Sequence, residues 1–328
     1  MYQPPKIKPL CPPEIPPRYE DMPYASVILD NGEDYELKMD IYQDSQQSQP
    51  GPCIIYIFGG GFLWGEYKQV TQKAVYCRDL VRLTKEGYTV VCPDYRLASQ
   101  SIFPACIQDL KGLVRFLKAH GREFHIDPER IGVLGNSAGG HLAMMLALSA
   151  DHPAIEGCVG GNLDQSSSVK TAVSFYGTAD LWDVLRDSVR ADYLSAKDLV
   201  GTEIENVGND QAPLIPAIIV GYTGQGRSIT KLHQVLESGN SSNQDWTYID
   251  LLKKCSPISY VYADCPPILL LHGSKDPIVN PNQSRKLYQS LVDAGADVTL
   301  VEYGQGGHGP SLGPEIDQFA YDFLKQNL

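Results

Sequence analysis

The sequence predicts an α/β fold, with a mostly parallel central sheet, helices on both faces, an N-terminal antiparallel hairpin and an inserted cap. Three features of the chain predict it. Short continuous apolar runs recur between Gly, Pro and charged residues, as in strands buried on both faces of a parallel sheet. Helix-length segments separate these runs, and an alternating hairpin precedes them. Alternating strands and helices after a hairpin indicate a doubly wound sheet with an antiparallel leading edge.

The individual elements follow in chain order. Residues 1–24 are rich in proline, which predicts an extended arm over the body or against a second subunit of a homodimer. Residues 25–30 and 35–42 alternate apolar and polar side chains around Asp30-Asn31-Gly32, which predicts a hairpin. Buried strands are predicted at 53–58, 89–92, 131–134, 172–175, 268–271 and 298–301. Helices are predicted at 70–86, 104–120, 138–150, 282–294 and 315–326.

Residues 181–260 interrupt this alternation. They contain helical pieces, a glycine-rich turn at 221–226 and a polar run at 238–245, with no pattern of a central strand. An insertion without its own sheet is most simply a cap over the carboxyl edge of the strands, where active sites of such sheets form. We therefore expect a core made of residues 25–180 and 261–328 and a cap or lid at 181–260.

Composition excludes several classes of protein. The net charge of −12 disfavours a nucleic-acid partner, which needs a basic surface. No apolar run approaches the ~20 residues that span a bilayer, and the proline-rich N-terminus lacks the apolar region of a secretory signal. The eight cysteines show no CxxC or metal-finger spacing, which favours reduced thiols in a cytoplasmic protein. We expect no membrane partner and no metal.

The main chemical signal is Gly135-Asn136-Ser137-Ala138-Gly139, between a predicted strand and a predicted helix. A G-x-S-x-G sequence in that context is a nucleophile elbow, in which the serine occupies a sharp bend. Its neighbours two residues away must be small, and the helix N-terminus directs free N–H groups at a developing oxyanion. The alternative is a structural turn, since the bare pattern also occurs by chance.

Two residues are candidates to activate Ser137. Elbow enzymes supply the acid and then the histidine further along the chain, and Asp276 and His308 each follow a predicted strand in that order. His308 would act as the base, and Asp276 would orient it. The alternatives are a turn-forming aspartate and a surface histidine. His272 and His141 are expected to have supporting or packing roles.

The glycine run Phe58-Gly59-Gly60-Gly61-Phe62 follows the first predicted central strand. Because glycine has no side chain, its backbone can approach a ligand closely. The N–H groups of Gly60 or Gly61, with that of Ala138, are candidates for an oxyanion hole. A tight turn without a ligand is the alternative, and a phosphate loop is disfavoured because no Gly-Lys-Ser/Thr follows.

These motifs resemble the α/β-hydrolases, in particular the esterase/lipase branch with an HGGG oxyanion loop and its bacterial feruloyl- and acetyl-esterase-like members. The resemblance extends over roughly 40–181 and 255–328. It rests on the segments 58–62, 93–97, 103–105 with Asp109, 124–131, 135–143, 256–257, 271–276 and 306–309. It implies hydrolysis of small acyl esters without a cofactor, for example acetyl or hydroxycinnamoyl esters on plant carbohydrate.

The chain departs from that pattern in two places. Phe58 stands where the family's loop begins with a histidine, which puts the loop geometry in question. The stretch between Ser137 and Asp276 is also longer than the family leads us to expect, and the excess lies within 181–260. Beneath the loop, Asp94 and Arg96 are expected to form a structural ion pair.

Aromatic residues near the loop and in the cap are candidates for a substrate pocket, because they offer large rigid contact surfaces. These candidates are Phe62, Trp64, Trp182 and Tyr222. Ordinary packing is the alternative for each of them. Two other functions also remain open, namely a peptidase or amidase of the same fold and a non-catalytic ligand-binding relative.

Overall fold

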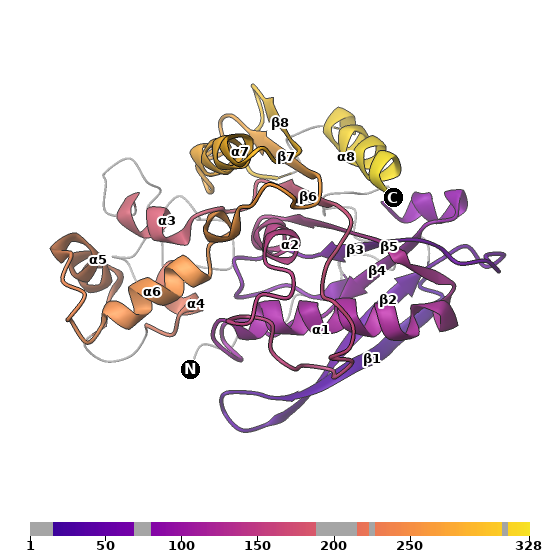
Figure 1. The fold of residues 1–328 in the computed structure, drawn as a ribbon, viewed down its shortest axis with the longest axis horizontal. Coiled ribbons are helices and arrows are strands. Elements are labelled where there is room, and N and C mark those ends of the chain that lie inside the picture. Colours follow the sequence, from indigo (N-terminus) through magenta and orange to yellow (C-terminus); the bar gives the residue numbers. More distant parts are fainter. Residues whose placement is uncertain (1–15, 69–79, 188–214, 223–226, 310–313) are drawn as a thin grey trace.

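The computed structural model describes residues 16–68, 80–187, 215–222, 227–309 and 314–328. Its strands are β1 (Tyr19–Ile28), β2 (Asp34–Tyr42), β3 (Gly51–Ile57), β4 (Thr89–Pro93), β5 (Ile126–Asn136), β6 (Ala172–Phe175), β7 (Ile268–Gly273) and β8 (Val298–Tyr303). Within these residues they form one eight-stranded sheet of order β1-β2-β4-β3-β5-β6-β7-β8 (Figure 1). The pairs β1–β2 and β2–β4 are antiparallel, and every other pair is parallel.

The core helices are α1 (Ala105–His120), α2 (Ala138–Leu148), α7 (Asn282–Ala294) and α8 (Pro314–Asn327). Two glycines of β5 show that helices cover both faces of the sheet. A Cβ on Gly135 would meet the Gly139 carbonyl in α2, whereas one on Gly132 would meet Leu328, just past α8. Positions 132 and 135 point to opposite faces because side chains alternate along a strand. The predicted doubly wound fold is confirmed.

The burial of the strands follows their place in the sheet. Every residue of the central strands β3 and β7 is buried, as continuous apolar runs predict for parallel strands covered on both sides. The edge strands β1 and β8 instead mix exposed and half-buried residues. The hydrophobic core therefore lies along the middle strands, and their carboxyl ends form a rigid edge on which a site can be built.

The start of the first strand differs from its sequence prediction. Strand β1 begins at Tyr19, inside the predicted arm, and pairs with β2 through two register irregularities. Asp21, with a φ of 54°, lies at the first irregularity and Pro23 at the second. Such bulges break the two-residue alternation that reveals a strand in a sequence. The predicted helix at 70–86 falls largely outside the described residues, and its end forms a 3₁₀ turn, Leu80–Glu86.

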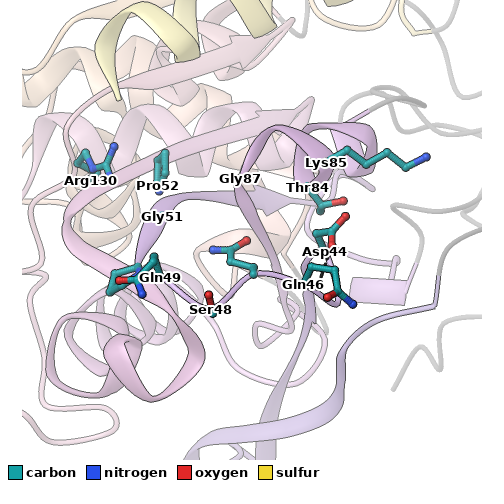
Figure 2. A pocket seen from close by; sticks show the side chains of 12 residues that line it. Asp44, Gln46, Ser48, Gln49, Gly51, Pro52, Thr84, Lys85, Gly87 and Arg130 are labelled. Atoms are coloured by element: carbon teal, nitrogen blue, oxygen red, sulfur yellow. Dashed lines mark hydrogen bonds between the residues drawn. The ribbon is translucent and has the colours of Figure 1, made fainter.

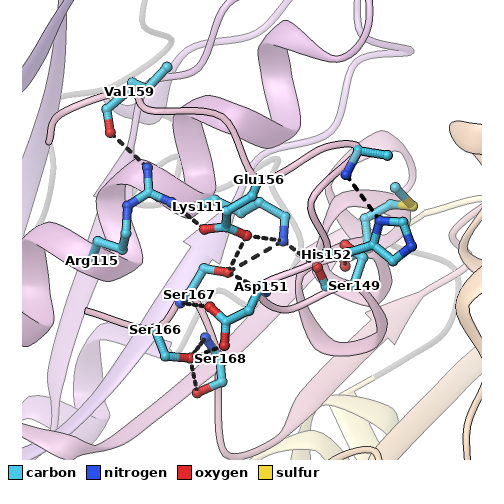
Figure 3. Close-up of polar contacts among 12 residues, drawn as sticks. Lys111, Arg115, Ser149, Asp151, His152, Glu156, Val159, Ser166, Ser167 and Ser168 are labelled. Atoms are coloured by element: carbon cyan, nitrogen blue, oxygen red, sulfur yellow. Dashed lines mark hydrogen bonds and ion pairs between the residues drawn. The ribbon is translucent and has the colours of Figure 1, made fainter. Parts of the chain in front are cut away.

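The loop from α2 to β6 is tied to α1 by a buried ionic cluster (Figure 3). Lys111 and Arg115 of α1 are almost completely buried, and both pair with Glu156 of the loop. Lys111 Nζ lies 2.8 Å from Glu156 Oε2, and Arg115 also donates to the carbonyl of Val159 at 2.9 Å. Asp151 closes the other side of the loop by accepting from the Ser167 amide at 2.9 Å. The segment that leads into β6 is thereby fixed.

The insertion between β6 and β7 is helical in its described residues. It contains α3 (Leu181–Asp187), α4 (Ile215–Ile219), α5 (Ile229–Ser238) and α6 (Trp246–Lys254), which gather beside one end of the sheet (Figure 1). Helix α4 contacts the core directly, because the Phe103 amide donates to the Ile219 carbonyl at 2.8 Å. A Cβ on Gly61, just past the end of β3, would lie 3.2 Å from Ile215 Cδ1. The insertion thus reaches the carboxyl edge of the strands.

A depression lies at the edge of the sheet where the parallel strands begin (Figure 2). Its lining includes Gly51, where β3 begins, and Thr84, Lys85 and Gly87, which precede β4. Because these residues stand at the amino ends of parallel strands, the depression is separate from the candidate site described below. Within the described residues, no helix combines the length and the apolar character needed to cross a membrane.

Candidate active site

Ser137 lies on the bend between β5 and α2. Its φ of 55° falls in the left-handed region, where a non-glycine residue is strained. The bend is possible because its neighbours are glycines: a Cβ on Gly139 would lie 2.1 Å from the Ile57 carbonyl oxygen, and one on Gly135 would lie 2.2 Å from the Gly139 oxygen. The Ser137 amide donates to the Phe175 carbonyl of β6 at 2.8 Å, which fixes the bend against the neighbouring strand.

His308 follows β8 and faces Ser137. Its Nε2 lies 3.1 Å from Ser137 Oγ, although 171 residues separate them in the chain. The loop that carries it crosses closely over the end of β7, where a Cβ on Gly273 would lie 2.4 Å from the Gly306 and Gly307 oxygens. The Tyr176 ring packs on the imidazole at a centroid distance of 4.4 Å. The imidazole of His308 thus contacts both the Tyr176 ring and the hydroxyl of Ser137.

Asp276 follows β7 and completes the chain of contacts. Its Oδ2 lies 2.8 Å from His308 Nδ1, and its Oδ1 accepts the amides of Ile278 and Val279 at 2.8 and 2.9 Å. Burial by itself would raise the pKa of this carboxyl. Hydrogen bonds from His272 and His308 outweigh burial and hold the pKa of Asp276 well below its usual range. The carboxylate therefore stays ionised at neutral pH.

The ionised carboxylate fixes the tautomer of His308. A carboxylate only accepts hydrogen bonds, so Nδ1 of His308 carries a hydrogen and donates it to Asp276. In neutral imidazole the lone pair then lies on Nε2, which faces the Ser137 hydroxyl. Ser137, His308 and Asp276, three residues predicted from the sequence, are thus brought together in the order in which a proton leaving the hydroxyl would be received.

The glycine loop lies directly against the serine. A Cβ on Gly59 would lie 3.2 Å from Ser137 Cβ, and Gly60 and Gly61 both have positive φ, 113° and 60°. The Gly60 carbonyl accepts the amides of Leu63 and Trp64, which closes the loop into a turn. Ala138 is the first residue of α2, where backbone N–H groups have no acceptor within the helix.

Phe58 replaces the expected histidine and braces the loop by packing. Its ring is buried and stacks on Tyr95 at 4.3 Å between centroids, and the Tyr95 hydroxyl donates to the Phe58 carbonyl at 3.0 Å. The ring is also close to Gly65, where a Cβ would lie only 2.5 Å from Phe58 Cδ2. Stacking and a hydrogen bond to the backbone hold the start of the glycine run.

The prediction that Arg96 pairs with Asp94 is wrong. Arg96 instead forms a bidentate ion pair with Asp109 of α1. Its Nη2 lies 2.6 Å from Asp109 Oδ1 and its Nε lies 2.9 Å from Asp109 Oδ2. Asp94 accepts the Tyr35 hydroxyl at 2.5 Å and its pKa is raised to about 6, chiefly by burial. No local pattern in the sequence indicates that α1 brings Asp109 next to Arg96.

The four predicted pocket residues have different surroundings. Trp64 borders the glycine loop, with Cη2 lying 3.5 Å from the position of a Cβ on Gly61. Phe62 is buried and packs edge-on against His141 at 5.1 Å. Trp182 is half-buried in the insertion, under Arg186 and Lys253, and Tyr222 is buried there with its hydroxyl 3.0 Å from Asp245. Contact with a substrate stays a prediction for all four.

Two residues near the site, Ile215 and Tyr176, were not expected there from the sequence. Ile215 of α4 lies over Gly61, and Tyr176 packs on His308. His272, expected to support or pack, contacts Asp276 Oδ2 at 3.3 Å. Its position at a strand end, four residues before the aspartate, is a signal for this contact. The sequence predicts a cap over the carboxyl edge of the strands, but no local pattern indicates that Ile215 contacts the glycine loop. Within the described residues, no group of three or more His, Cys, Asp or Glu could hold a metal ion.

The sheet order, the strained serine and the strand-end histidine define the fold class of the α/β-hydrolases. A carbohydrate esterase from gut microbiota, solved in truncated form, has the same fold, with a TM-score of 0.69, 25% identity, and coverage of 94% of this chain and 95% of its own. The propionate-bound esterase Est2 of Thermogutta terrifontis aligns with a TM-score of 0.63 at 22% identity, covering 94% of this chain and 93% of its own.

The BD-FAE family model matches residues 39–222 and 230–291, so the chain belongs to the BD-FAE family. Esterase LipQ of Mycobacterium tuberculosis is 30% identical over 300 residues, which are 90% of this chain and 58% of LipQ. Esterase LipC of the same organism is 25% identical over 283 residues, 86% of this chain and 59% of LipC. The chain thus spans somewhat more than half the length of these relatives.

Proposed function

We propose that this protein is a serine carboxylesterase that hydrolyses small acyl esters through an acyl-enzyme. The observation that carries the proposal is the continuous line of contacts from Ser137 Oγ to His308 and on to Asp276, at 3.1 and 2.8 Å. Membership of the BD-FAE family and similarity to proteins named esterases support the same reaction.

In this mechanism the Ser137 hydroxyl attacks the ester carbonyl while His308 Nε2 accepts its proton. Asp276 stabilises the resulting imidazolium and keeps its ring in place. The N–H groups of Gly60 or Gly61 and of Ala138 donate to the oxyanion of the tetrahedral intermediate, and losing one such donor typically costs ~10²–10³ in turnover. His308 then returns the proton to the leaving alcohol.

The second half-reaction repeats these steps with water. His308 takes a proton from a water molecule, the hydroxide attacks the acyl-enzyme, and the proton returns to Ser137 Oγ as the acid leaves. No cofactor takes part in these reaction steps. The proposed substrates are acetyl or hydroxycinnamoyl esters on plant carbohydrate, a class consistent with the carbohydrate esterase that shares the fold.

A panel of substrates tests the proposal. The purified chain should release p-nitrophenol from p-nitrophenyl acetate, release acetate or ferulate from acylated xylan, and leave the matching p-nitroanilides intact. The Ser137→Ala variant should lose this turnover while its circular dichroism stays unchanged. Cleavage of the anilides in preference to the esters would favour a peptidase or amidase, and no turnover of either class would favour a ligand-binding protein.

A further inference from the structure

A second histidine lies on the far side of the proposed triad. His272 is the next-to-last residue of β7, which is paired with β6 and β8, and only 1% of its surface is exposed. Its Nε2 lies 2.9 Å from the Val279 carbonyl and 3.3 Å from Asp276 Oδ2. Its Nδ1 lies 2.7 Å from Ser284 Oγ of α7. Both nitrogens of the ring are therefore engaged.

The partners of Nε2 determine its protonation. A backbone carbonyl and an ionised carboxylate only accept hydrogen bonds, so Nε2 of His272 must carry a hydrogen. A lone pair in that position would face two acceptors in a buried site, which is strongly unfavourable. The N–H thus points at the Val279 carbonyl and beside Oδ2 of Asp276, while Ser284 holds the opposite end of the ring.

The same loop also holds the other oxygen of Asp276. The amides of Ile278 and Val279 donate to Oδ1 at 2.8 and 2.9 Å, so the turn from Asp276 to Val279 encloses the carboxylate. His272 fastens that turn to the sheet through the Val279 carbonyl. The imidazole of His272 therefore contacts both the turn that follows Asp276, through the Val279 carbonyl, and Oδ2 of Asp276, the oxygen that accepts from His308.

We propose that His272 is a positioning residue for the reaction, holding the Asp276 carboxylate in the orientation that fixes His308. This inference rests on the proposed function, since it needs a working triad. Hydrogen bonding of His272 to Asp276 also lowers the pKa of the carboxyl, against the effect of burial, which keeps the acid ionised. An error of about 1 Å in the placement of a reacting group can cost ~10² in rate, so a loosened carboxylate should reduce turnover.

Two substitutions at His272 separate positioning from packing. His272→Gln keeps an N–H donor near the place of Nε2, whereas His272→Met fills a similar volume without a donor. The concentration of active sites is measured by titration with a fluorophosphonate, which forms one stable adduct per reactive serine, so that kcat is calculated per reactive Ser137. We expect His272→Met to lose about 10–100-fold in kcat with KM changed less than about twofold, and His272→Gln to recover at least half of that loss on a logarithmic scale.

A milder change covers the case in which His272→Met does not fold. Ser284→Ala removes the contact at Nδ1 and should lower kcat while KM is preserved. Ser149→Ala, which removes another buried hydroxyl that bonds to a helix carbonyl at Met145, serves as the matched control and should keep the kcat of the unsubstituted protein. Turnover per titrated site that is unchanged in His272→Met and Ser284→Ala, with only the melting temperature lowered, would overturn the inference. Failure of the unsubstituted protein to hydrolyse any ester would instead overturn the proposed function.

Discussion

At the scale of single residues, the site depends on a strained backbone at the serine, on glycines with no space for a side chain and on close contacts to the histidine. Ser137 is strained, and the strain is tolerated because glycines flank it and backbone carbonyls occupy the space that a Cβ would need. The imidazole of His308 is placed by contacts on three sides, from Ser137, Asp276 and the Tyr176 ring. Small changes at these positions should therefore have large effects on turnover.

Gly139→Ala tests the steric requirement at the elbow. The added methyl group would lie 2.1 Å from the Ile57 oxygen, so α2 must shift away from β3 and carry Ser137 with it. We expect kcat/KM to fall by ~100-fold or more and the melting temperature to drop. Gly304→Ala is the matched control, because nothing lies within 4 Å of its Cβ position, and it should keep normal activity. Full activity in Gly139→Ala would show that the elbow tolerates the displacement.

His141 gives the fold a dependence on pH. Burial lowers the pKa of His141 to about 4, while its Nδ1 donates to the Thr178 carbonyl at 2.7 Å. The unfolded chain binds this proton near pH 6.5, so the stabilisation is complete above that pH and is lost as the pH falls towards 4. The loss should amount to roughly 2–4 kcal/mol.

Urea unfolding of the unsubstituted protein and of His141→Asn at several pH values measures this effect. Asparagine can keep a donor to the Thr178 carbonyl but does not titrate. The free energy of unfolding of the unsubstituted protein should therefore fall more steeply than that of the variant between pH 6.5 and 4. Two parallel curves would show that His141 does not carry this dependence.

At the scale of elements, the proposed site combines the sheet edge with the insertion. Strands β5, β7 and β8 each deliver one member of the serine–histidine–aspartate constellation, and β3 delivers the glycine loop. Helix α4 closes over that loop through Ile215, beside Trp64. We therefore expect the strands to position the reacting groups and the insertion to influence which acyl group is accepted.

Ile215→Ala should widen the space above Gly61. With the branched side chain shortened, we expect the ratio of kcat/KM for p-nitrophenyl hexanoate to that for the acetate to rise about tenfold or more, as removal of a few methylene groups from a pocket allows. Val235→Ala, within the packing of α5, is the control for a general loosening of the insertion and should leave the ratio unchanged. An unaltered acyl preference in Ile215→Ala would remove α4 from the substrate site.

Helix α1 should depend on Glu156 for its attachment to the loop before β6. Glu156→Gln would remove the carboxylate that pairs with both Lys111 and Arg115, whose side chains are 0% and 1% exposed. We expect the variant to lose about 3–5 kcal/mol in urea unfolding, because an unpaired buried charge is costly. Glu129→Gln, at an exposed pair with Lys170, should change stability by at most ~1 kcal/mol. Equal effects of the two changes would contradict a structural role for the cluster.

At the scale of the whole molecule, the features that local patterns record can be predicted from the sequence, whereas contacts between distant segments cannot. The parallel strands appear in the sequence as apolar runs. Ser137, Asp276 and His308 are predicted to lie together because each follows a strand and the carboxyl ends of parallel strands share one edge, and the structure brings them into contact. The start of β1 was missed because bulges near Asp21 and Pro23 interrupt its alternation. The partner of Arg96 and the contact of Ile215 with the glycine loop depend on packing between distant segments, which no local pattern records.

The most direct test of the central claim is covalent labelling of the serine. The purified chain is incubated with an excess of a fluorophosphonate, and intact-mass and peptide-mapping measurements are compared with residual ester hydrolysis. The account predicts a single adduct on Ser137, formed in proportion to the loss of activity, and no adduct in Ser137→Ala. Hydrolysis that persists after Ser137 is fully labelled, or an adduct that inactivates the protein from another residue, would contradict it.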